Sequence, residues 1–404
     1  MINSGNTAFV LISAALVCLM TPGLAFFYGG LVRRKNTLSI MTQCFVSMGV
    51  VTAIWVVCGF SLVFGPDVHG LIGNLDYAFL NGVGMAPNST YAPTIPFIVF
   101  FIFQVMFAVI APALITGAFA DRMNFKSYLI LLVCWSFLVY IPVAHWVWGG
   151  GFLQQMGVKD FAGGLVIHLT AGIAAMPCVL FIGKRHIMPD EDQSPHNITY
   201  VALGAGLIWF GWFGFNGGSA LAADGVAAMA FVNTGIAASI AMVTWLIISW
   251  RQEKSPSLIG MLTGAVAGLV LITPAAGYVQ PWAAILIGII SSIVCYFAIQ
   301  KRKTWGWDDA LDVWGIHGVG GIAGSILVGV FAESQIGGFS GLIEGNTHQL
   351  IIQLFSVLLI AAYSYVVTYA LLKVINAFAP VRVSKEVEIR GLDLSIYNEQ
   401  AYKI

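Results

Sequence analysis

Two segments of the chain share one pattern, His168-Leu-Thr-Ala-Gly172-Ile-Ala174 and His317-Gly-Val-Gly-Gly321-Ile-Ala323. Each places an ionisable histidine inside a long apolar run. An ionisable group at membrane depth is costly, so two of them in matched contexts indicate a functional site. For either histidine alone, a satisfied packing residue is the alternative interpretation. The repetition favours a conduction pathway across a bilayer.

The composition indicates a membrane protein. Hydrophobic residues make up 59% of the chain and charged residues 9%, whereas a soluble domain carries about a quarter charged residues. The net charge is zero, so no nucleic-acid partner is expected. The 45 glycines are typical of close helix packing in lipid, and the long apolar runs favour helices over a barrel.

The motifs argue against an enzyme or a cofactor site. All 6 cysteines lie in apolar runs without a Cys-x-x-Cys pair, which predicts buried small side chains and no metal or disulfide framework. No phosphate loop, HExxH helix or GxSxG elbow occurs in the sequence. We therefore expect no catalytic residues, no metal and no cofactor.

Eleven transmembrane helices are predicted, because a bilayer core requires roughly 20 apolar residues per helix. With this assignment, all but Lys159 of the 18 Lys and Arg residues fall on one face, which the positive-inside rule makes cytoplasmic. The N-terminus is then outside and the C-terminus inside. A cleaved signal peptide is the alternative for the first span, but its positive charges follow the apolar run. The spans lie near 7–31, 38–64, 95–119, 127–147, 161–182, 198–217, 226–250, 258–273, 281–299, 310–331 and 349–378.

The histidine repeat predicts an inverted repeat of five plus five helices. His168 lies in the fifth span, which runs inward, and His317 lies in the tenth, which runs outward. Such halves are related by a pseudo-two-fold axis in the membrane plane, with sites near the midplane. Each histidine lies roughly 12 Å deep at 1.5 Å per residue, so the symmetry brings the two together.

The domain boundaries follow from this assignment. The membrane domain covers 1–378, with halves at about 7–182 and 198–331 and an eleventh helix at 349–378. The polar segment 379–404 contains no span and forms a cytoplasmic tail.

Two aspartates precede the histidine helices. Asp160 opens the fifth span, and Asp312 stands five residues before His317. Aspartate at a helix start usually caps free N–H groups. Capping is therefore the leading interpretation of Asp160, with direct ligand contact as the alternative, and Asp312 is expected to give structural support.

Aromatic side chains gather near the ends of several spans. Trp148 lies in His145-Trp-Val-Trp148-Gly-Gly-Gly151, where an interfacial aromatic belt is the default explanation. Taken alone, the phenylalanines of the third and sixth spans are expected to face the core or the lipid: Phe103, Phe107, Phe210, Phe213 and Phe215.

Four motifs together strongly resemble the ammonium transporter (Amt/Rh) family, and its Amt branch more than its Rh branch. The resemblance extends over essentially the whole chain. The motifs are Pro22-Gly-Leu-Ala-Phe-Phe-Tyr-Gly-Gly30, Asp160-Phe-Ala-Gly-Gly-Leu-Val-Ile-His168-Leu-Thr-Ala-Gly172, Phe210-Gly-Trp-Phe-Gly-Phe215-Asn-Gly-Gly-Ser219 and Asp312-Val-Trp-Gly-Ile-His317-Gly.

This resemblance implies a substrate path for ammonium, with methylammonium as an analogue. Trp148, Ser219 and Phe107 would form an outer substrate-binding site that Asp160 supports. Phe107 and Phe215 would form a gate beneath it.

The resemblance also implies a pore, partners and a location. His168 and His317 would form a twin-histidine pair in a narrow apolar pore. Family members are multi-pass homotrimers of the cell membrane, and a PII-type signalling protein closes many of them from the cytoplasm. The tail resembles the family's regulatory tail, although Tyr397-Asn398 stands where the family often has His-Gly. An ordinary solvated terminus is the alternative for the tail.

Physical chemistry is compatible with these roles. An aromatic cage can hold ammonium by cation–π attraction, and a serine hydroxyl can accept one of its N–H bonds. A charged ion in an apolar pore meets a severe desolvation cost, which splitting ammonium into ammonia and a proton avoids. Imidazole both accepts and donates protons near neutrality. We therefore expect electrogenic transport of ammonia with a separately relayed proton.

Two other function classes remain open at this point. An ammonium sensor could use the same scaffold, although no signalling domain is evident in the sequence. A membrane electron carrier could use the paired histidines as haem ligands, although no basic group stands near either histidine to hold propionates.

Overall fold

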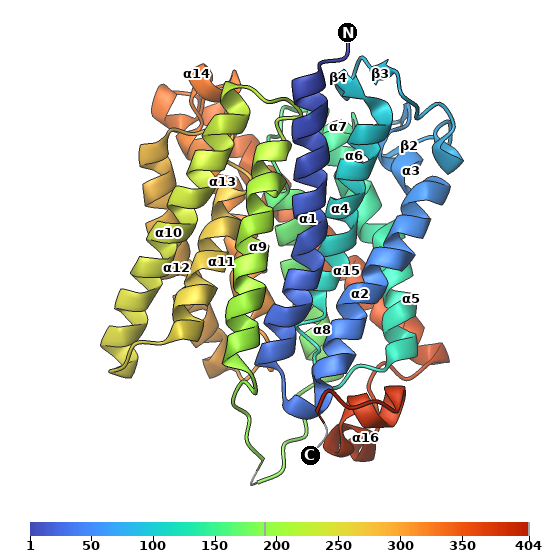
Figure 1. The fold of residues 1–404 in the computed structure, drawn as a ribbon, viewed down its shortest axis with the longest axis vertical. Coiled ribbons are helices and arrows are strands. Elements are labelled where there is room, and N and C mark those ends of the chain that lie inside the picture. Colours follow the sequence, from blue (N-terminus) through green and yellow to red (C-terminus); the bar gives the residue numbers. More distant parts are fainter. Residues whose placement is uncertain (190, 403–404) are drawn as a thin grey trace.

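The computed structural model describes residues 1–189 and 191–402 as a bundle of long helices that run between two opposite faces (Figure 1). The N-terminus lies at one face, called here the N-terminal face, and the described part of the chain ends near the other, the C-terminal face. Positions 190, 403 and 404, including Lys403 and the end of the predicted tail, lie outside the described residues.

The first half of the bundle forms five membrane-crossing segments. Three of them contain a π-helical turn, in which the backbone ladder admits one extra residue. The segments are α1 (Ser4–Leu31); α2 (Thr37–Ile54), η2 (Trp55–Gly59) and α3 (Phe60–Phe64); α4 (Phe97–Ile115); α5 (Phe125–Trp135), η4 (Ser136–Tyr140) and α6 (Ile141–Trp148); and η5 (Gly164–Leu169) with α8 (Thr170–Ile182).

The second half adds five crossings, and a long last helix follows them. The five crossings are α9 (Ile198–Gly218), α10 (Gly225–Glu253), α11 (Leu258–Ile272), α12 (Pro281–Trp305), and η6 (Trp314–Gly318) with α13 (Val319–Phe331). The last helix is α15 (Thr347–Phe378).

The predicted fold class is confirmed: ten helices of the described chain are long and apolar enough to cross a membrane. The predicted span 258–273 forms α11, which has only 15 residues. Pro274 follows it, and the buried residues Ala275, Ala276 and Val279 continue the path without helix.

Short elements connect the helices. Two small antiparallel hairpins pair β1 with β2 and β3 with β4. At the other end of the chain, the tail carries a short helix and a π-helical turn. The bounds are η1 (Arg34–Asn36), β1 (Asp67–Val68), β2 (Ile72–Gly73), η3 (Ala78–Leu80), β3 (Pro87–Asn88), β4 (Ala92–Pro96), α7 (Phe152–Gln155), α14 (Ser334–Gly337), η7 (Leu342–Glu344), α16 (Lys385–Arg390) and η8 (Asp393–Tyr397).

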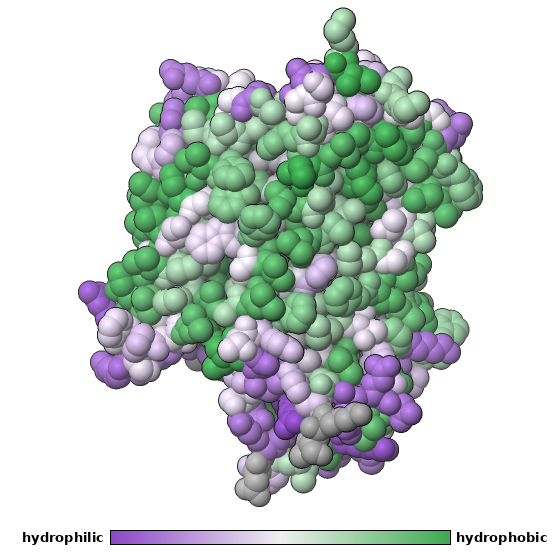
Figure 2. Space-filling view, viewed as in Figure 1, coloured by the Kyte–Doolittle hydropathy of each residue, from purple (hydrophilic) through white to green (hydrophobic). Residues whose placement is uncertain are grey.

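The exterior of the bundle is apolar between its two faces. Figure 2 shows hydrophobic residues across the middle of the molecule and hydrophilic ones gathered at the faces, most densely at the C-terminal face. Large apolar side chains such as Ile12 on α1 and Leu358 on α15 are exposed. Helices satisfy their own backbone hydrogen bonds, so such a surface is stable in lipid.

The two halves meet at the segments that carry the histidines. Each histidine lies in a π-helical turn, η5 or η6, that continues into an α-helix of 13 residues. The segments cross at glycines, because a Cβ on Gly172 would overlap the backbone nitrogen of Gly318 and one on Gly321 would lie 2.6 Å from the nitrogen of Leu169. Only glycine permits this approach, which brings the two histidines together.

Candidate functional site

His168 and His317 form a stacked pair in the centre of the bundle. Their Nδ1 atoms lie 3.2 Å apart, and their ring centroids lie 5.2 Å apart with planes inclined by 21°. One Nδ1 therefore donates and the other accepts, so the two tautomers are linked. The Nε2 atom of His168 is buried and has no hydrogen-bond partner in the described part of the chain. The pair thus offers a free nitrogen to a small ligand.

A narrow apolar cavity of about 20 Å³ lies against the two rings. This volume accommodates roughly one water molecule. Apart from the histidines, the lining side chains are hydrophobic or aromatic, so an ion inside would lose its hydration without replacement. The cavity is lined by Met20, Leu24, Phe27, Tyr28, Ile110, Leu114, His168, Ile208, Trp212, Phe215, Val266 and His317.

The histidine geometry argues against a haem carrier. Two axial bonds of about 2 Å each would separate the ring nitrogens by about 4 Å across the metal. The observed Nδ1–Nδ1 separation of 3.2 Å is that of a hydrogen bond. The rings also stack on each other, which leaves no place for a macrocycle between them.

Asp160 caps the π-helical turn that holds His168. Its Oδ1 accepts hydrogen bonds from the backbone nitrogens of Gly163 (2.9 Å) and Gly164 (2.7 Å). Its Oδ2 accepts from those of Leu165 (2.8 Å) and Val166 (3.1 Å). Four otherwise free N–H groups are thereby satisfied. This geometry favours the capping interpretation over direct ligand contact, because both oxygens are already occupied.

In the second half, Asp309 takes the position equivalent to Asp160. It stands eight residues before His317, as Asp160 stands eight before His168. Its Oδ2 accepts from the backbone nitrogen of Trp314 at 2.7 Å. Asp309 was not among the residues predicted from the sequence, although the equal spacing was a signal for it. Asp312 instead forms an ion pair with Arg302 at 2.6 Å, which is a supporting role.

A wider cavity of about 220 Å³ lies towards the N-terminal face. Its lining includes the four residues of the predicted substrate-binding site, Phe107, Trp148, Ser219 and Asp160, and also Gln104. The Trp148 ring stands edge-on to Phe107 with centroids 6.1 Å apart. The Ser219 hydroxyl donates to the carbonyl of Phe215 at 2.8 Å, so its lone pairs remain free to accept. The cavity therefore combines aromatic faces with a hydrogen-bond acceptor.

Two stacked rings separate the wide cavity from the narrow one. The rings of Phe107 and Phe215 have centroids 4.4 Å apart and an interplanar angle of 29°. Phe107 lines the wide cavity and Phe215 the narrow one. The Phe215 and His168 centroids lie 6.2 Å apart. The site is thus a single file of cavity, ring pair and histidine pair.

Only some of the aromatic candidates converge on this file. Phe103 supports Phe107 edge-on, with centroids 4.8 Å apart. Phe210 is 57% exposed, and Phe213 stacks on Phe231 away from the file. Trp212, which sequence analysis did not select, stacks on His168 with centroids 5.3 Å apart. Its indole nitrogen donates to Thr273, and its place inside a quoted motif was the available signal.

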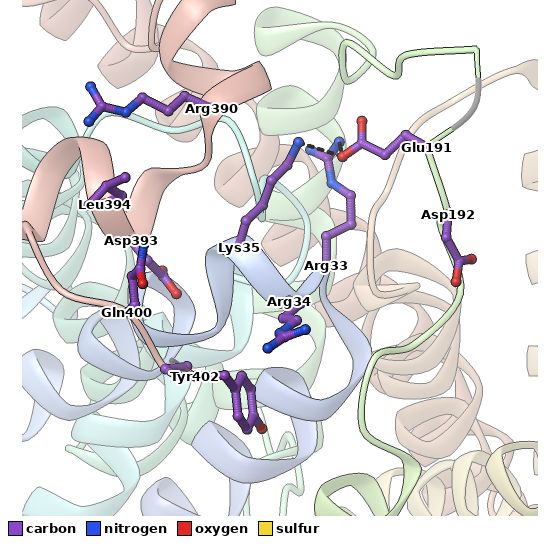
Figure 3. A pocket seen from close by; sticks show the side chains of 11 residues that line it. Arg33, Arg34, Lys35, Glu191, Asp192, Arg390, Asp393, Leu394, Gln400 and Tyr402 are labelled. Carbon is purple, nitrogen blue, oxygen red and sulfur yellow. Dashed lines mark hydrogen bonds and ion pairs between the residues drawn. The ribbon is translucent and has the colours of Figure 1, made fainter. Parts of the chain in front are cut away.

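The tail folds back onto the C-terminal face beside a cavity of about 270 Å³ (Figure 3). Asp393 accepts hydrogen bonds from the backbone nitrogens of Leu38 and Ser39 and so caps α2. The guanidinium of Arg34 lies over the ring of Tyr402, 5.1 Å from its centroid. The contacts therefore join the tail to the segment between α1 and α2.

The residues Tyr397-Asn398, which depart from the family pattern, fit this docked tail. Asn398 ends η8 in the left-handed conformation, with φ 54°. Asparagine tolerates that conformation best after glycine. The Tyr397 ring packs edge-on against Phe125, with centroids 5.3 Å apart. The departure therefore preserves the local backbone.

An ion network ties the connecting segments of the C-terminal face together. Asp121 pairs with Arg33 (2.9 Å) and Arg185 (3.3 Å), and Asp308 pairs with Arg185 (2.7 Å). Burial opposes ionisation of Asp308, but the hydrogen bonds and charge of Arg185 outweigh it and lower its pKa to about 2. Ionised Asp308 therefore stabilises the folded chain.

Replacing Asp308 with asparagine should destabilise the protein by about 2 kcal/mol at neutral pH. A carboxyl whose pKa is lowered on folding contributes stability above its unfolded pKa and loses it as the pH falls through the folded value. The difference between Asp308→Asn and the unchanged protein should therefore shrink as the pH falls from about 4 to about 2. Thermal unfolding in detergent measures it, with the exposed Asp76→Asn as control. A pH-independent difference would contradict this account.

The chain is similar to known proteins in both sequence and structure. Residues 8–402 match the model of the Ammonium Transporter Family. An ammonium transporter of Bacillus subtilis is 46% identical over 402 residues, with 99% of this chain and 98% of the relative covered. The crystal structure of Candida albicans Mep2 matches with a TM-score of 0.89 and 34% identity, covering 95% of this chain and 87% of that one. A structure described as a sensor Amt protein matches with a TM-score of 0.90 and 31% identity, covering 97% and 98%.

Proposed function

Since the chain belongs to the ammonium transporter family, we propose that it moves ammonium across a cell membrane through the file of cavities between its two halves. The observation that carries this proposal is the order of the groups. A wide aromatic cavity is followed by the Phe107–Phe215 pair and then by His168 and His317. Each group suits one step of ammonium passage.

The wide cavity recruits the cation. The faces of Trp148 and Phe107 attract a desolvating ammonium ion by roughly 2 kcal/mol. The Ser219 oxygen accepts one of its N–H bonds, because its own hydrogen is already directed to the Phe215 carbonyl. Asp160 supports this site from below, since its backbone carbonyl accepts the indole N–H of Trp148 at 2.9 Å. Potassium has the charge of ammonium but cannot donate to Ser219.

The histidine pair handles the proton. An intact ion entering the apolar cavity would lose most of its hydration, so ammonium gives up a proton and ammonia passes alone. The linked Nδ1 atoms of His168 and His317 relay that proton, since each ring can accept at one nitrogen and release at the other. Net movement of ammonia plus a proton makes transport electrogenic.

The orientation and partners complete the proposal. The N-terminal face lies outside, because the basic residues gather at the opposite face and mark it as cytoplasmic. The membrane domain comprises 1–378, and the tail beyond it regulates the pore from the cytoplasm. The protein forms a homotrimer with one pore per subunit, and a PII-type protein is a candidate partner at the face where the tail docks.

Current measurements test the central proposal. The purified protein in liposomes should give a transient current after an ammonium pulse and none after a potassium pulse. Internal alkalinisation without current would show electroneutral passage of ammonia and overturn the proton relay. If the liposomes show neither current nor alkalinisation, the second candidate function remains, an ammonium sensor. The match to the sensor Amt structure favours this candidate.

Replacing Trp148 with leucine should raise the KM for methylammonium about 30-fold with little change in maximal rate, because about 2 kcal/mol of cation–π attraction is lost. Uptake of labelled methylammonium by liposomes measures both parameters. The matched control is Trp282→Leu on the exposed side of α12, which should behave like the unchanged protein. An unaltered KM in Trp148→Leu would remove Trp148 from the binding site.

A further inference from the structure

His145 is a third buried histidine whose hydrogen bonds the proposed transport steps leave unused. It lies on α6, one helical turn before Trp148, and is fully buried. Its Nδ1 lies 2.6 Å from the backbone oxygen of Val63. Its Nε2 lies 2.9 Å from Oδ1 of Asp67. Both ring nitrogens are therefore in contact with oxygen atoms.

These contacts favour one protonation state of the ring. A carbonyl oxygen and an ionised carboxylate can only accept hydrogen bonds. A neutral imidazole has one N–H, so one of its nitrogens would present a lone pair to an oxygen lone pair. An imidazolium donates at both positions. Only the doubly protonated ring can donate in both contacts, which favours a charged His145 paired with Asp67.

Asp67 is suited to remain ionised. Both of its oxygens also accept from the backbone nitrogen of Gly70, at 2.9 and 3.0 Å. The hydrogen bond from His145 is the largest cause that lowers its pKa. The Asp67 side chain is 32% exposed, whereas that of His145 is inaccessible. The pair thus joins a buried cation to an anion that reaches solvent at the N-terminal face.

The pair lies where the end of α6 is held in place. The His145 carbonyl accepts from the backbone nitrogens of Gly149 (2.9 Å) and Gly151 (3.0 Å), which closes the helix just after Trp148. A Cβ on Gly149 would overlap the Val63 oxygen, so the contact is too close for any other residue. Movement of the His145 ring would therefore be transmitted to Trp148.

The β1–β2 hairpin also forms hydrogen bonds with residues on both sides of Trp148. The carbonyl of Gly70 accepts from the backbone nitrogen of Phe152 at 3.0 Å. The carbonyl of Leu71 accepts from the indole of Trp146 at 2.9 Å. Asp67 begins this hairpin, which thus holds the chain both before and after Trp148.

We propose that His145 is a positioning residue for the ammonium site: as an imidazolium paired with Asp67, it holds the end of α6 and thereby sets the Trp148 ring. The proposal rests on the proposed role of Trp148 in binding. It implies that loss of the hydrogen bond between His145 and Asp67 loosens Trp148 and weakens substrate binding.

Other titratable groups surround the pair without replacing either member. His69 lies in the same hairpin as Asp67, and Tyr91 donates its hydroxyl to the Gly149 carbonyl at 3.0 Å. Asp160 lies beyond Trp148 and uses both carboxylate oxygens on backbone N–H groups. Within the described residues, Asp67 is the charged group that forms a hydrogen bond with the His145 ring.

Asp67→Asn removes the negative charge beside His145 and retains a side chain that can form the same hydrogen bonds. An asparagine amide can donate to Nε2 while its oxygen accepts from Gly70, so a neutral His145 then satisfies both contacts. The KM for methylammonium should rise about tenfold in Asp67→Ala, which leaves the Nε2 of His145 without its partner. In Asp67→Asn it should stay near that of the unchanged protein. Asp76→Asn, in the same loop, should also retain the unchanged protein's KM.

Nitrogen NMR of histidine-labelled protein in lipid provides a readout independent of transport. Of the 7 histidines, the one whose signal His145→Gln removes should show two protonated ring nitrogens at neutral pH, and one in Asp67→Asn. A singly protonated His145 in the unchanged protein would overturn the proposal, as would an unaltered KM in Asp67→Ala. If Trp148→Leu leaves the KM unaltered, the binding site fails instead, and the NMR result still decides the state of His145.

Discussion

Replacing both His168 and His317 with alanine is expected to reduce the ammonium-driven current at least about 100-fold, the usual contribution of a positioned proton-transfer group. The enlarged cavity would remain apolar, so an intact ion would still meet the desolvation cost. The other described side chains that line the cavity are hydrophobic or aromatic, so they offer no base for the proton beneath the Phe107–Phe215 pair. Currents in liposomes after ammonium and potassium pulses measure the effect.

The matched control for this experiment is His348→Ala. His348 is exposed near the start of α15, so its loss should leave the current intact. Two results would contradict the relay. One is a full ammonium current in the double variant. The other is an added potassium current beside a retained ammonium current, which would show that the widened cavity passes whole ions.

Replacing Asp160 with alanine is expected to destabilise the protein by at least about 3 kcal/mol, because several buried N–H groups lose their acceptor at once. The four donors belong to the turn that holds His168, so the current should fall as well. Asp160→Asn should be intermediate, since it retains one acceptor oxygen. Unfolding in detergent, followed by tryptophan fluorescence, measures stability beside the transport assay.

Asp224→Ala provides the comparison for an ordinary cap. Asp224 caps α10 through one hydrogen bond to the nitrogen of Ala227 at 3.0 Å, and its loss should cost about 1 kcal/mol. A stable Asp160→Asn protein with a much higher KM would reverse the interpretation. It would indicate that Asp160 contacts ammonium directly rather than acting through the helix.

The sequence was sufficient for the membrane class, the eleven spans and the inverted repeat. Hydropathy adds up along a segment irrespective of its neighbours, so even the short α11 was located within a few residues. The repeated histidine pattern then required two antiparallel copies, and their meeting followed from symmetry. The repeated pattern also contains Gly172 and Gly321, and these two glycines form the close crossing of the segments.

The capping pattern was only partly readable from the sequence. Asp160 was assigned as a cap, but Asp309 was passed over in favour of Asp312, which is nearer to His317 in the sequence. The turns that carry the histidines are π-helical, and no local pattern of residues reveals that extra residue per turn. The equal spacing of Asp160 and Asp309 from their histidines was the signal that the sequence did contain.

Which side chains face the pore was decided by the tertiary structure alone. Phe215 enters the file while Phe210 and Phe213 point away, although all three lie on one apolar helix. In a chain that is hydrophobic on every side, periodicity does not distinguish lipid from interior. The state of His145 is a further case, because its partners Val63 and Asp67 lie about 80 residues away in the sequence. The hydrophobicity of a segment shows from the sequence whether that segment can lie in lipid. The rotation of each helix and the partners of each polar atom depend on contacts between segments, which only the tertiary structure provides.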